Sequence, residues 1–202
     1  MEKRIKRLRN WISSLKTKLP LDREKVSTLV ARKLEDNEFF LSAKRVLLFY
    51  GLDDEVDTRQ IIQNACSKGK IVYLPRCKKK EELFTIGRVN SLGDLEKSSY
   101  GIMEPKQNMH RDCSVEDLDL VILPGVVFDT KGNRIGRGKG YYDKFLKKTG
   151  KKTKRIGVAF DFQVVEDVSG RKHDEPVDVV VTEKRIIYVK KQGRSLQQKK
   201  SR

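Results

Sequence analysis

A glycine-rich segment that alternates with cations is the part of this chain best suited to chemistry. Glycines stand at positions 132, 136, 138 and 140, and Arg134, Arg137 and Lys139 lie among them. Glycines let backbone N–H groups crowd around an anion, and the cations add positive potential. A helical pattern begins at Tyr141 and Tyr142, so a helix N-terminus would point at the same place. The segment predicts a cradle for a polyphosphate.

An acid follows this segment directly and extends the predicted chemistry. The carboxylate of Asp143 is a hard oxygen ligand of the kind that takes the Mg²⁺ accompanying a nucleotide. The segment matches neither a Walker A loop, because Gly140 follows Lys139, nor a Rossmann fingerprint, because its glycine spacing differs. A glycine-rich hairpin that only turns the chain is the competing interpretation. The cations, the two tyrosines and the acid favour the phosphate site.

Strands and helices alternate along the rest of the chain and must position this loop. Apolar runs predict strands at 46–50, 71–75, 118–123, 155–160, 177–182 and 185–189, with a hairpin or edge strand from 83. Helical spacing of apolar residues predicts helices at 5–19, 26–41, 61–66 and 141–148. This order predicts an α/β fold, an open and mostly parallel sheet with helices on both faces. Ligands of such sheets bind beyond the carboxyl ends of the strands.

Composition limits the class of protein. The 202 residues suit a single domain, predicted at 1–191, followed by a basic and frayed tail at 192–202. No apolar stretch approaches the ~20 residues of a membrane span. The three cysteines have no C-x-x-C spacing, which favours free thiols and a cytoplasmic location.

The net charge of +17 raises nucleic acid as an alternative partner. The basic clusters at 76–80 and 147–155 lack the interleaved aromatics of a nucleic-acid reader, so nucleic acid is the less favoured partner. A general attraction for anionic ligands is the favoured interpretation.

Residues 124–143 closely resemble the signature of the 5-formyltetrahydrofolate cyclo-ligase family, also called 5,10-methenyltetrahydrofolate synthetase. The shared pattern is Pro-Gly, a Phe-Asp pair, and then Gly-x-Arg-Ile-Gly-x-Gly-x-Gly-Tyr-Tyr-Asp. Four further short motifs of the family occur in this chain in the same order as in the family, at 55–58, 74–75, 101–105 and 173–174. The resemblance covers about residues 3 to 182 and implies a three-layer fold like that of sugar-phosphate isomerases and CoA transferases. A sugar-phosphate isomerase or a CoA transferase is therefore a further rival function.

The resemblance implies an ATP- and Mg²⁺-dependent enzyme. A monomer is expected, although the sequence alone does not determine the oligomeric state. The enzyme would cyclise 5-formyltetrahydrofolate, a polyglutamylated form included, to 5,10-methenyltetrahydrofolate. ADP and phosphate would be released through a phosphorylated formyl group, an imino-phosphate.

The resemblance also assigns residues to this site. ATP would be bound by Lys3, Arg7, Arg134, Ile135, Gly136, Arg137, Gly138, Lys139, Gly140, Tyr141 and Tyr142. Arg134, Lys139 and Tyr142 would be catalytic, and Tyr50, Glu55, Tyr141 and Tyr142 would bind the folate. The magnesium ligands would be Asp143 and Asp174.

Some assignments leave alternatives open. A shifted N-terminal pair that includes Lys6 could contact ATP in place of Lys3 and Arg7, and Asp174 could be a turn residue before Pro176. Asp129 could be a third acid near the metal, although turn capping is favoured. Residues 103–105 would floor the folate pocket, with no role assigned to them.

Overall fold

The computed structural model describes residues 2–19, 21–78, 83–98, 101–109, 113–168 and 175–190. Its main sheet has seven strands in the order β12-β11-β9-β6-β1-β2-β3. These strands are β1 (Arg45–Leu47), β2 (Ile71–Lys78), β3 (Leu83–Val89), β6 (Leu120–Pro124), β9 (Lys154–Val158), β11 (Val179–Val181) and β12 (Ile186–Tyr188). The inner strands pair in parallel, and β3 and β12 add antiparallel edges. The predicted open, mostly parallel sheet is confirmed.

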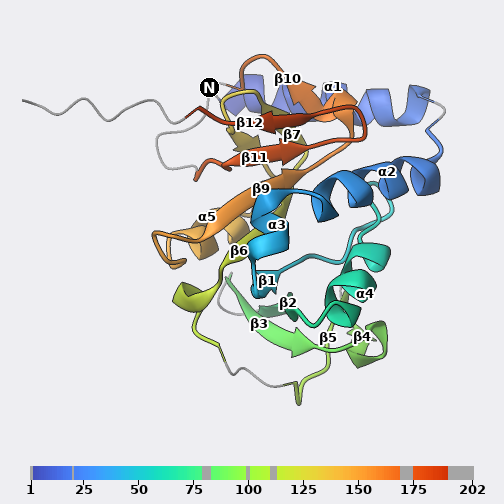
Figure 1. The fold of residues 1–202 in the computed structure, drawn as a ribbon. Coiled ribbons are helices and arrows are strands. Elements are labelled where there is room, and N and C mark those ends of the chain that lie inside the picture. Colours follow the sequence, from blue (N-terminus) through green and yellow to red (C-terminus); the bar gives the residue numbers. More distant parts are fainter. Residues whose placement is uncertain are drawn as a thin grey trace, which may run out of the picture.

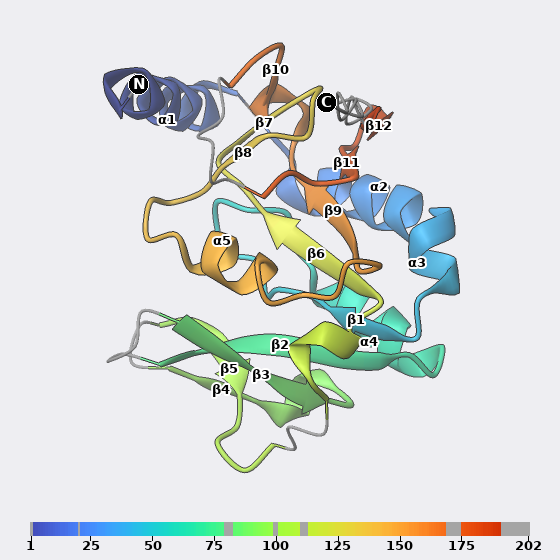
Figure 2. The same cartoon turned by 90° about the vertical axis from the view of Figure 1, so that its left-hand side faces the viewer.

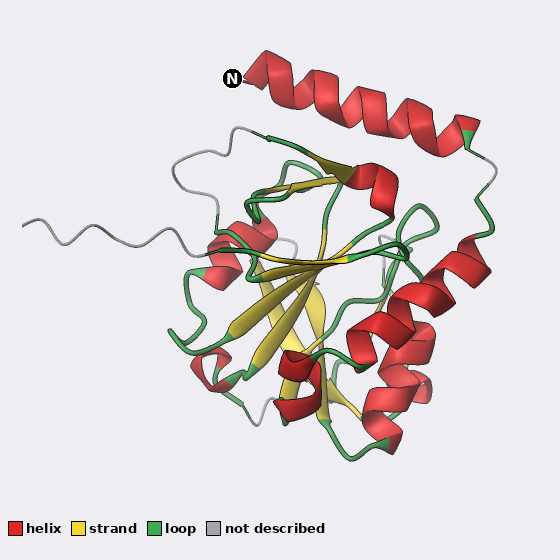
Figure 3. Cartoon of the chain, turned by 45° about the horizontal axis from the view of Figure 1, so that its top comes forward, coloured by secondary structure: helices red, strands yellow, loops and turns green. Residues whose placement is uncertain are grey.

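Helices cover both faces of this sheet, which gives three layers. They are α1 (Glu2–Lys18), α2 (Arg23–Glu35), α3 (Glu38–Ser42), α4 (Arg59–Ser67) and α5 (Tyr141–Leu146), with 3₁₀ turns at Leu92–Asp94, Val115–Asp117 and Asp161–Gln163. Figure 2 shows the sheet with α2, α3 and α4 on one side and α5 on the other. The helix α1 lies apart, across the end of the sheet (Figure 1 and Figure 3).

Alternating side chains of the strands build two cores. Val46, Leu48 and Ile122 face the core under α2 and α4, whereas Leu47 and Val121 face the core under α5. Successive residues of a strand point to opposite faces, so a sheet covered on both sides needs a nearly continuous apolar run. A third, smaller core joins Ile5 and Ile12 of α1 to the loop beyond β6.

Two smaller sheets were not predicted. One comprises β10 (Val164–Val165), β7 (Val127–Asp129) and β8 (Arg134–Ile135), and the other β4 (Leu95–Lys97) and β5 (Met103–Pro105). The loop predicted after β6 therefore contains a short hairpin, β7 and β8, whose strands are too brief to show alternation in sequence.

The helix predicted at 26–41 is two helices. The side chain of Asn37 accepts a hydrogen bond from the Phe39 N–H and starts α3, while Asp22 caps α2 through the Lys25 N–H. Asparagine is a strong N-cap, and this explains the break. The predicted tail at 192–202 and Asp174 lie outside the described residues, and the single domain at 1–191 stays a prediction.

The ring of Phe128 lies against two glycines at the carboxyl ends of β6 and β9. A Cβ at Gly157 would come within 2.3 Å of Phe128 Cε1, and one at Gly125 within 2.4 Å of Phe128 Cε2. Both glycines are therefore required by the close approach of this ring. Since Gly125 also borders the cavity described below, the ring supports the floor of the site.

We expect Gly157→Ala to lower the free energy of unfolding by about 1–3 kcal/mol, because it overpacks the space that Phe128 fills. Urea denaturation of Gly157→Ala, Phe128→Leu and the double variant would measure this. The added cost of Gly157→Ala should shrink markedly in the Phe128→Leu background. Strictly additive costs would show that Phe128 is not the obstacle.

Candidate functional site

A cavity of about 480 Å³ opens at the carboxyl ends of the central strands. Residues after β1 and β6, the carboxyl half of β2, the glycine loop before α5 and one face of α1 all contribute to its wall. This is the edge at which ligands of open α/β sheets bind. The segments from which the sequence predicted a site, the loop after β1 and the glycine loop, both contribute to this cavity, and their role stays a prediction.

One end of the cavity is cationic. The backbone of residues 136–140 lines it together with Arg134, Arg137, Lys139 and Arg9. Gly138 and Gly140 adopt φ of 105° and 66°, which side-chain-bearing residues rarely adopt. The helix α5 that follows has only 6 residues, so the positive potential comes mainly from the four side chains. Such an end suits a polyphosphate.

Arg134 is the most buried of these cations, with 4% of its side-chain surface exposed. Its Nη2 donates to Asp143 Oδ1 at 2.7 Å and its Nη1 to the Pro124 carbonyl at 3.3 Å. Its guanidinium also lies 5.6 Å from the centre of the Tyr142 ring. The Nε is buried without a hydrogen-bond partner among the described residues. These contacts fix the guanidinium at the cavity wall.

Asp143 is paired with this arginine through a single carboxylate oxygen, Oδ1. Within the described residues, no three His, Cys, Asp or Glu side chains come together as a metal site. Mg²⁺ is commonly held by one or two carboxylates plus substrate phosphates, so Asp143 beside the cationic end fits that arrangement. Asp174 is outside the described residues, and its predicted role stays a prediction.

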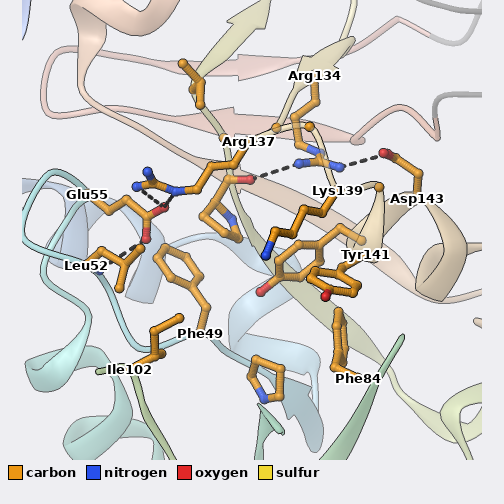
Figure 4. A pocket seen from close by; sticks show the side chains of 18 of the residues that line it. Phe49, Leu52, Glu55, Phe84, Ile102, Arg134, Arg137, Lys139, Tyr141 and Asp143 are labelled. Atoms are coloured by element: carbon orange, nitrogen blue, oxygen red, sulfur yellow. Dashed lines mark hydrogen bonds and ion pairs between the residues drawn. The ribbon is translucent and has the colours of Figure 1, made fainter. Parts of the chain in front are cut away.

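The glycine loop crosses the mouth of the cavity and contacts the loop after β1. Arg137 Nε and Nη2 donate to Glu55 Oε1 at 3.2 and 3.0 Å (Figure 4). Nη2 also donates to Asp54 Oδ1. The other oxygen of Glu55 accepts from the Leu52 N–H at 3.1 Å. Burial lowers the pKa of Arg137, but Glu55 and Asp54 outweigh this effect and raise that pKa above its usual value.

The opposite end of the cavity is largely apolar. Phe49, Leu52, Pro75, Phe84, Ile102 and Met103 line it. Tyr142 packs edge-on against Phe84 at 5.1 Å, and burial, followed by Glu55, raises the pKa of its hydroxyl. Tyr50 and Tyr141 also border the cavity, and the Lys139 Nζ lies 6.0 Å from the Tyr141 ring. Flat apolar walls with a few polar groups suit a heteroaromatic ring.

A thiol and a second carboxylate lie in this apolar end. Glu104 of β5 is only 4% exposed, and its Oε1 accepts from the Cys77 N–H at 3.3 Å. Burial and the neighbouring Glu104 raise the pKa of Cys77 to about 11, so its thiol stays protonated at neutral pH. Sequence reasoning gave residues 103–105 no role and missed Cys77. The signal that could have found this part of the site is Glu104, an acid within the otherwise apolar stretch 102–105.

The structure does not bring Lys3 and Arg7 to the cavity. Ile5 and Arg9 line it, whereas Lys3 and Arg7 are exposed. Helical periodicity places Lys3 and Arg7 roughly 160° around α1 from Ile5. Arg9 Nε donates to the Gly136 carbonyl at 3.0 Å, so it holds the glycine loop directly. Sequence reasoning missed Arg9, although it shares the apolar face of the helix.

Asp129, weighed as a third acid near the metal, is a turn residue. Its carboxylate accepts from the backbone N–H groups of Lys131, Asn133 and Val168 and from the Asn133 side chain. These bonds satisfy a fully buried carboxylate and stabilise the β7–β8 turn. The favoured interpretation, turn capping, agrees with this environment.

The fold and cavity together define an α/β protein whose pocket at the carboxyl ends of the strands has a cationic end and an apolar end. The chain belongs to the 5-formyltetrahydrofolate cyclo-ligase family, whose profile matches residues 2–183. This confirms the resemblance carried by the glycine loop. Searched over its described residues, the structure has no helix with the length and apolarity of a bilayer crossing.

Relatives with established names agree with the family. The chain is 34% identical over 171 residues to 5-formyltetrahydrofolate cyclo-ligase of Mus musculus, covering 80% of this chain and 84% of that protein. It is 33% identical over 150 residues to the Escherichia coli K12 enzyme of the same name, covering 71% and 80%. Among solved structures, 5,10-methenyltetrahydrofolate synthetase of Aquifex aeolicus aligns with a TM-score of 0.80 at 35% identity, covering 97% of both chains. The synthetase of Mycoplasma pneumoniae shares the fold, with a TM-score of 0.66 at 18% identity, covering 89% of this chain and 98% of that one.

The position of α1 leads to a prediction about its cations. If the cationic end holds ATP, as proposed below, Arg9→Ala should raise the KM for ATP about tenfold, because the lost bond to the Gly136 carbonyl is a hydrogen bond from a charged group and contributes on the order of 1.5 kcal/mol to holding the loop. Arg7→Ala is the matched control on the exposed face and should change KM less than twofold. Initial rates at varied ATP would measure both. A larger effect of Arg7→Ala would support the family's assignment and require α1 to move when ATP binds.

Proposed function

We propose that this protein catalyses the ATP- and Mg²⁺-dependent cyclisation of 5-formyltetrahydrofolate to 5,10-methenyltetrahydrofolate, with release of ADP and phosphate. The observation that supports this proposal most is the cavity with two different ends. Glycines and cations line one end, and the other end is apolar and contains carboxylates. The names of the relatives point to the same substrate and product. A polyphosphate and a pteridine need such complementary surroundings.

The chemistry begins at the formyl oxygen, which is a poor leaving group. The γ-phosphoryl group of ATP is transferred to that oxygen, giving ADP and an imino-phosphate. N10 then attacks the formyl carbon and loses its proton, and the C–O bond breaks to release inorganic phosphate. The formyl oxygen thus leaves as part of the phosphate, and N5 and N10 share the new one-carbon bridge.

The cations of the cradle have a direct role in the first step. Phosphoryl-transfer transition states spread negative charge over the equatorial oxygens, and fixed cations stabilise this charge. Arg134 is held in place by Asp143 and Pro124, so it needs little reorganisation. Lys139 and Arg137, both exposed, can close over the phosphates. Mg²⁺, when bound with ATP beside Asp143, would neutralise further phosphate charge.

The folate is oriented by the other half of the site. The exocyclic amine and a ring N–H of the pteridine can donate to the carboxylate of Glu55, a charge-assisted pair of bonds. Tyr50 and Tyr142 offer aromatic surface at the same end. Holding the formyl oxygen close to the γ-phosphorus lowers the entropic barrier, because the two reactants become part of one complex.

A direct assay tests this function. The full-length protein is mixed with 5-formyltetrahydrofolate, ATP and MgCl₂, and the absorbance of the methenyl product is followed. We expect product only when both ATP and Mg²⁺ are present. Product at full rate without a nucleotide would contradict the mechanism, and no product under any condition would contradict the activity.

The charge excess leads to a prediction about polyglutamylated substrate. Lys147, Lys148, Lys151 and Lys152 are exposed after α5, and each added glutamate of the folate tail brings another carboxylate. Attraction of this kind is screened within ~8–10 Å at ordinary salt, so the advantage of a polyglutamate over a monoglutamate should shrink as salt rises. Kinetics on both substrates at low and high salt would measure it. Removing residues 193–202 should leave the advantage unchanged. No advantage at any salt concentration would make RNA binding the first alternative to test.

A further inference from the structure

Arg137 and Glu55 are assigned to different ligands, yet in this structure they bind each other. Two nitrogens of Arg137 contact Glu55 Oε1 at 3.0 and 3.2 Å across the cavity mouth. The Leu52 N–H donates a hydrogen bond to Glu55 Oε2 at 3.1 Å. Only 11% of the Glu55 side chain is exposed. Both oxygens of the carboxylate are therefore engaged before any ligand arrives.

While Arg137 and Glu55 bind each other, Arg137 cannot bind the phosphates and Glu55 cannot accept both bonds from the pteridine. A pteridine that donates two N–H bonds to Glu55 must displace the arginine, and a nucleotide that draws Arg137 to its phosphates must break the same pair. In the free protein Arg137 is paired with two carboxylates, Glu55 and Asp54. The triphosphate of ATP carries more negative charge than these two groups together, so it can draw the guanidinium away from them. Nucleotide binding can therefore supply the free energy that releases Glu55.

The neighbouring charges make the release selective for Glu55. Asp54, the second partner of Arg137, also accepts from Lys16 of α1 at 3.0 Å, so it keeps a cation when Arg137 leaves. Among the described residues, Glu55 has no second cation in its salt bridges. Once Arg137 leaves, Glu55 is a buried and unpaired carboxylate, a state that favours binding of new donors.

The backbone around Arg137 permits the exchange. Gly136 and Gly138 flank it, and Gly138 has a φ of 105°. The Gly136 carbonyl is fixed by Arg9 at 3.0 Å, which gives the loop an anchored end about which Arg137 can turn. Figure 4 shows Arg137 directed at Glu55, while Arg134 points away toward Asp143.

We infer that Arg137 couples the two halves of the site, so that nucleotide binding strengthens folate binding and folate binding strengthens nucleotide binding. This inference rests on the proposed function. The coupling is reciprocal by thermodynamic necessity. In the free protein, the Arg137–Glu55 pair weakens the binding of either ligand alone. Arg137 is thus a positioning residue for the folate as well as a phosphate ligand.

Calorimetric titration measures this coupling. The dissociation constant of 5-formyltetrahydrofolate is determined for the full-length protein alone and with a saturating, non-hydrolysable ATP analogue and Mg²⁺. We expect the analogue to tighten folate binding at least fivefold, at the lower end of typical coupling strengths. In Arg137→Gln, folate should bind more tightly than to the wild type without nucleotide, and the analogue should change its affinity less than twofold.

Two further variants separate the coupling from general effects. Asp54→Asn loosens the hold on Arg137 without removing it, so it should tighten folate binding in the absence of nucleotide and reduce the coupling. Arg59→Gln removes an exposed arginine that pairs with Asp57 in the neighbouring segment, and it should leave the coupling unchanged. The substitution is the same as at position 137, which makes it a matched control.

The possible outcomes distinguish this inference from the proposed function. If both ligands bind the wild type but the analogue does not change the affinity for folate, the inferred coupling is wrong and the proposed function stands. Coupling that persists in Arg137→Gln and in Asp54→Asn would also overturn the inference. Failure of the wild type to bind either ligand would contradict the proposed function itself.

Discussion

Replacing Glu55 by glutamine should lower kcat/KM for 5-formyltetrahydrofolate by about 100-fold. The proposed pair of bonds from the pteridine is charge-assisted, and hydrogen bonds to a charged group contribute about 1.5–3 kcal/mol each. Glutamine keeps the shape of the side chain but presents only one acceptor oxygen. Since it also releases Arg137, the KM for ATP should stay the same or fall. Steady-state kinetics with each substrate varied would separate the two effects.

Glu96→Gln is the matched control for this substitution. Glu96 lies on β4 opposite Glu104 of β5, pairs with Arg76 and has 44% of its side chain exposed. An exposed ion pair contributes little to stability, so activity should stay near that of the wild type. Equal and small losses in Glu55→Gln and Glu96→Gln would remove Glu55 from the folate site.

Asp143→Asn should lower turnover by about 10–100-fold at limiting Mg²⁺, with part of the loss recovered as Mg²⁺ is raised. A carboxylate contributes charge to a magnesium site that an amide lacks. Asparagine retains an oxygen that can accept from Arg134, so the effect on stability should be about 1–2 kcal/mol. Initial rates over a range of Mg²⁺ concentrations measure the expected dependence.

Thermal unfolding of the same variant is the necessary control, because Arg134 is buried and loses its charged partner. A variant that stays folded at the assay temperature, yet shows the Mg²⁺-dependent loss, supports a role at the metal. Near-normal activity at limiting Mg²⁺ would remove Asp143 from it. A loss that no Mg²⁺ concentration changes would assign Asp143 to the positioning of Arg134 alone.

Much of the fold could be predicted because the side-chain periodicity is strong. Strands such as 71–75 and 120–123 are apolar on both faces, and the covering helices show clear 3.6-residue spacing. The break at Asn37 and the short β7–β8 hairpin were missed. Both depend on local hydrogen bonds of a few residues, which leave no periodic signal.

The candidate site was predictable where one segment of sequence carries it and not where distant segments meet. The glycine loop and Asp143 are continuous in sequence, so their proximity was expected. The pairing of Arg137 with Glu55 joins residues 82 positions apart and depends on how the loops cross the cavity mouth. Arg9 shares the apolar face of α1 with Ile5 and Ile12, so the sequence did carry a signal for it, whereas Lys3 and Arg7 were assigned from the resemblance alone.

The transfer of oxygen tests the central claim most directly. Substrate labelled with ¹⁸O at the formyl group is converted with unlabelled ATP, and the inorganic phosphate is analysed by mass spectrometry. If the cavity transfers the γ-phosphoryl group to the formyl oxygen, each methenyl product should be accompanied by one phosphate that carries the label. Unlabelled phosphate, with the ¹⁸O recovered in water, would contradict that transfer and the account of this site.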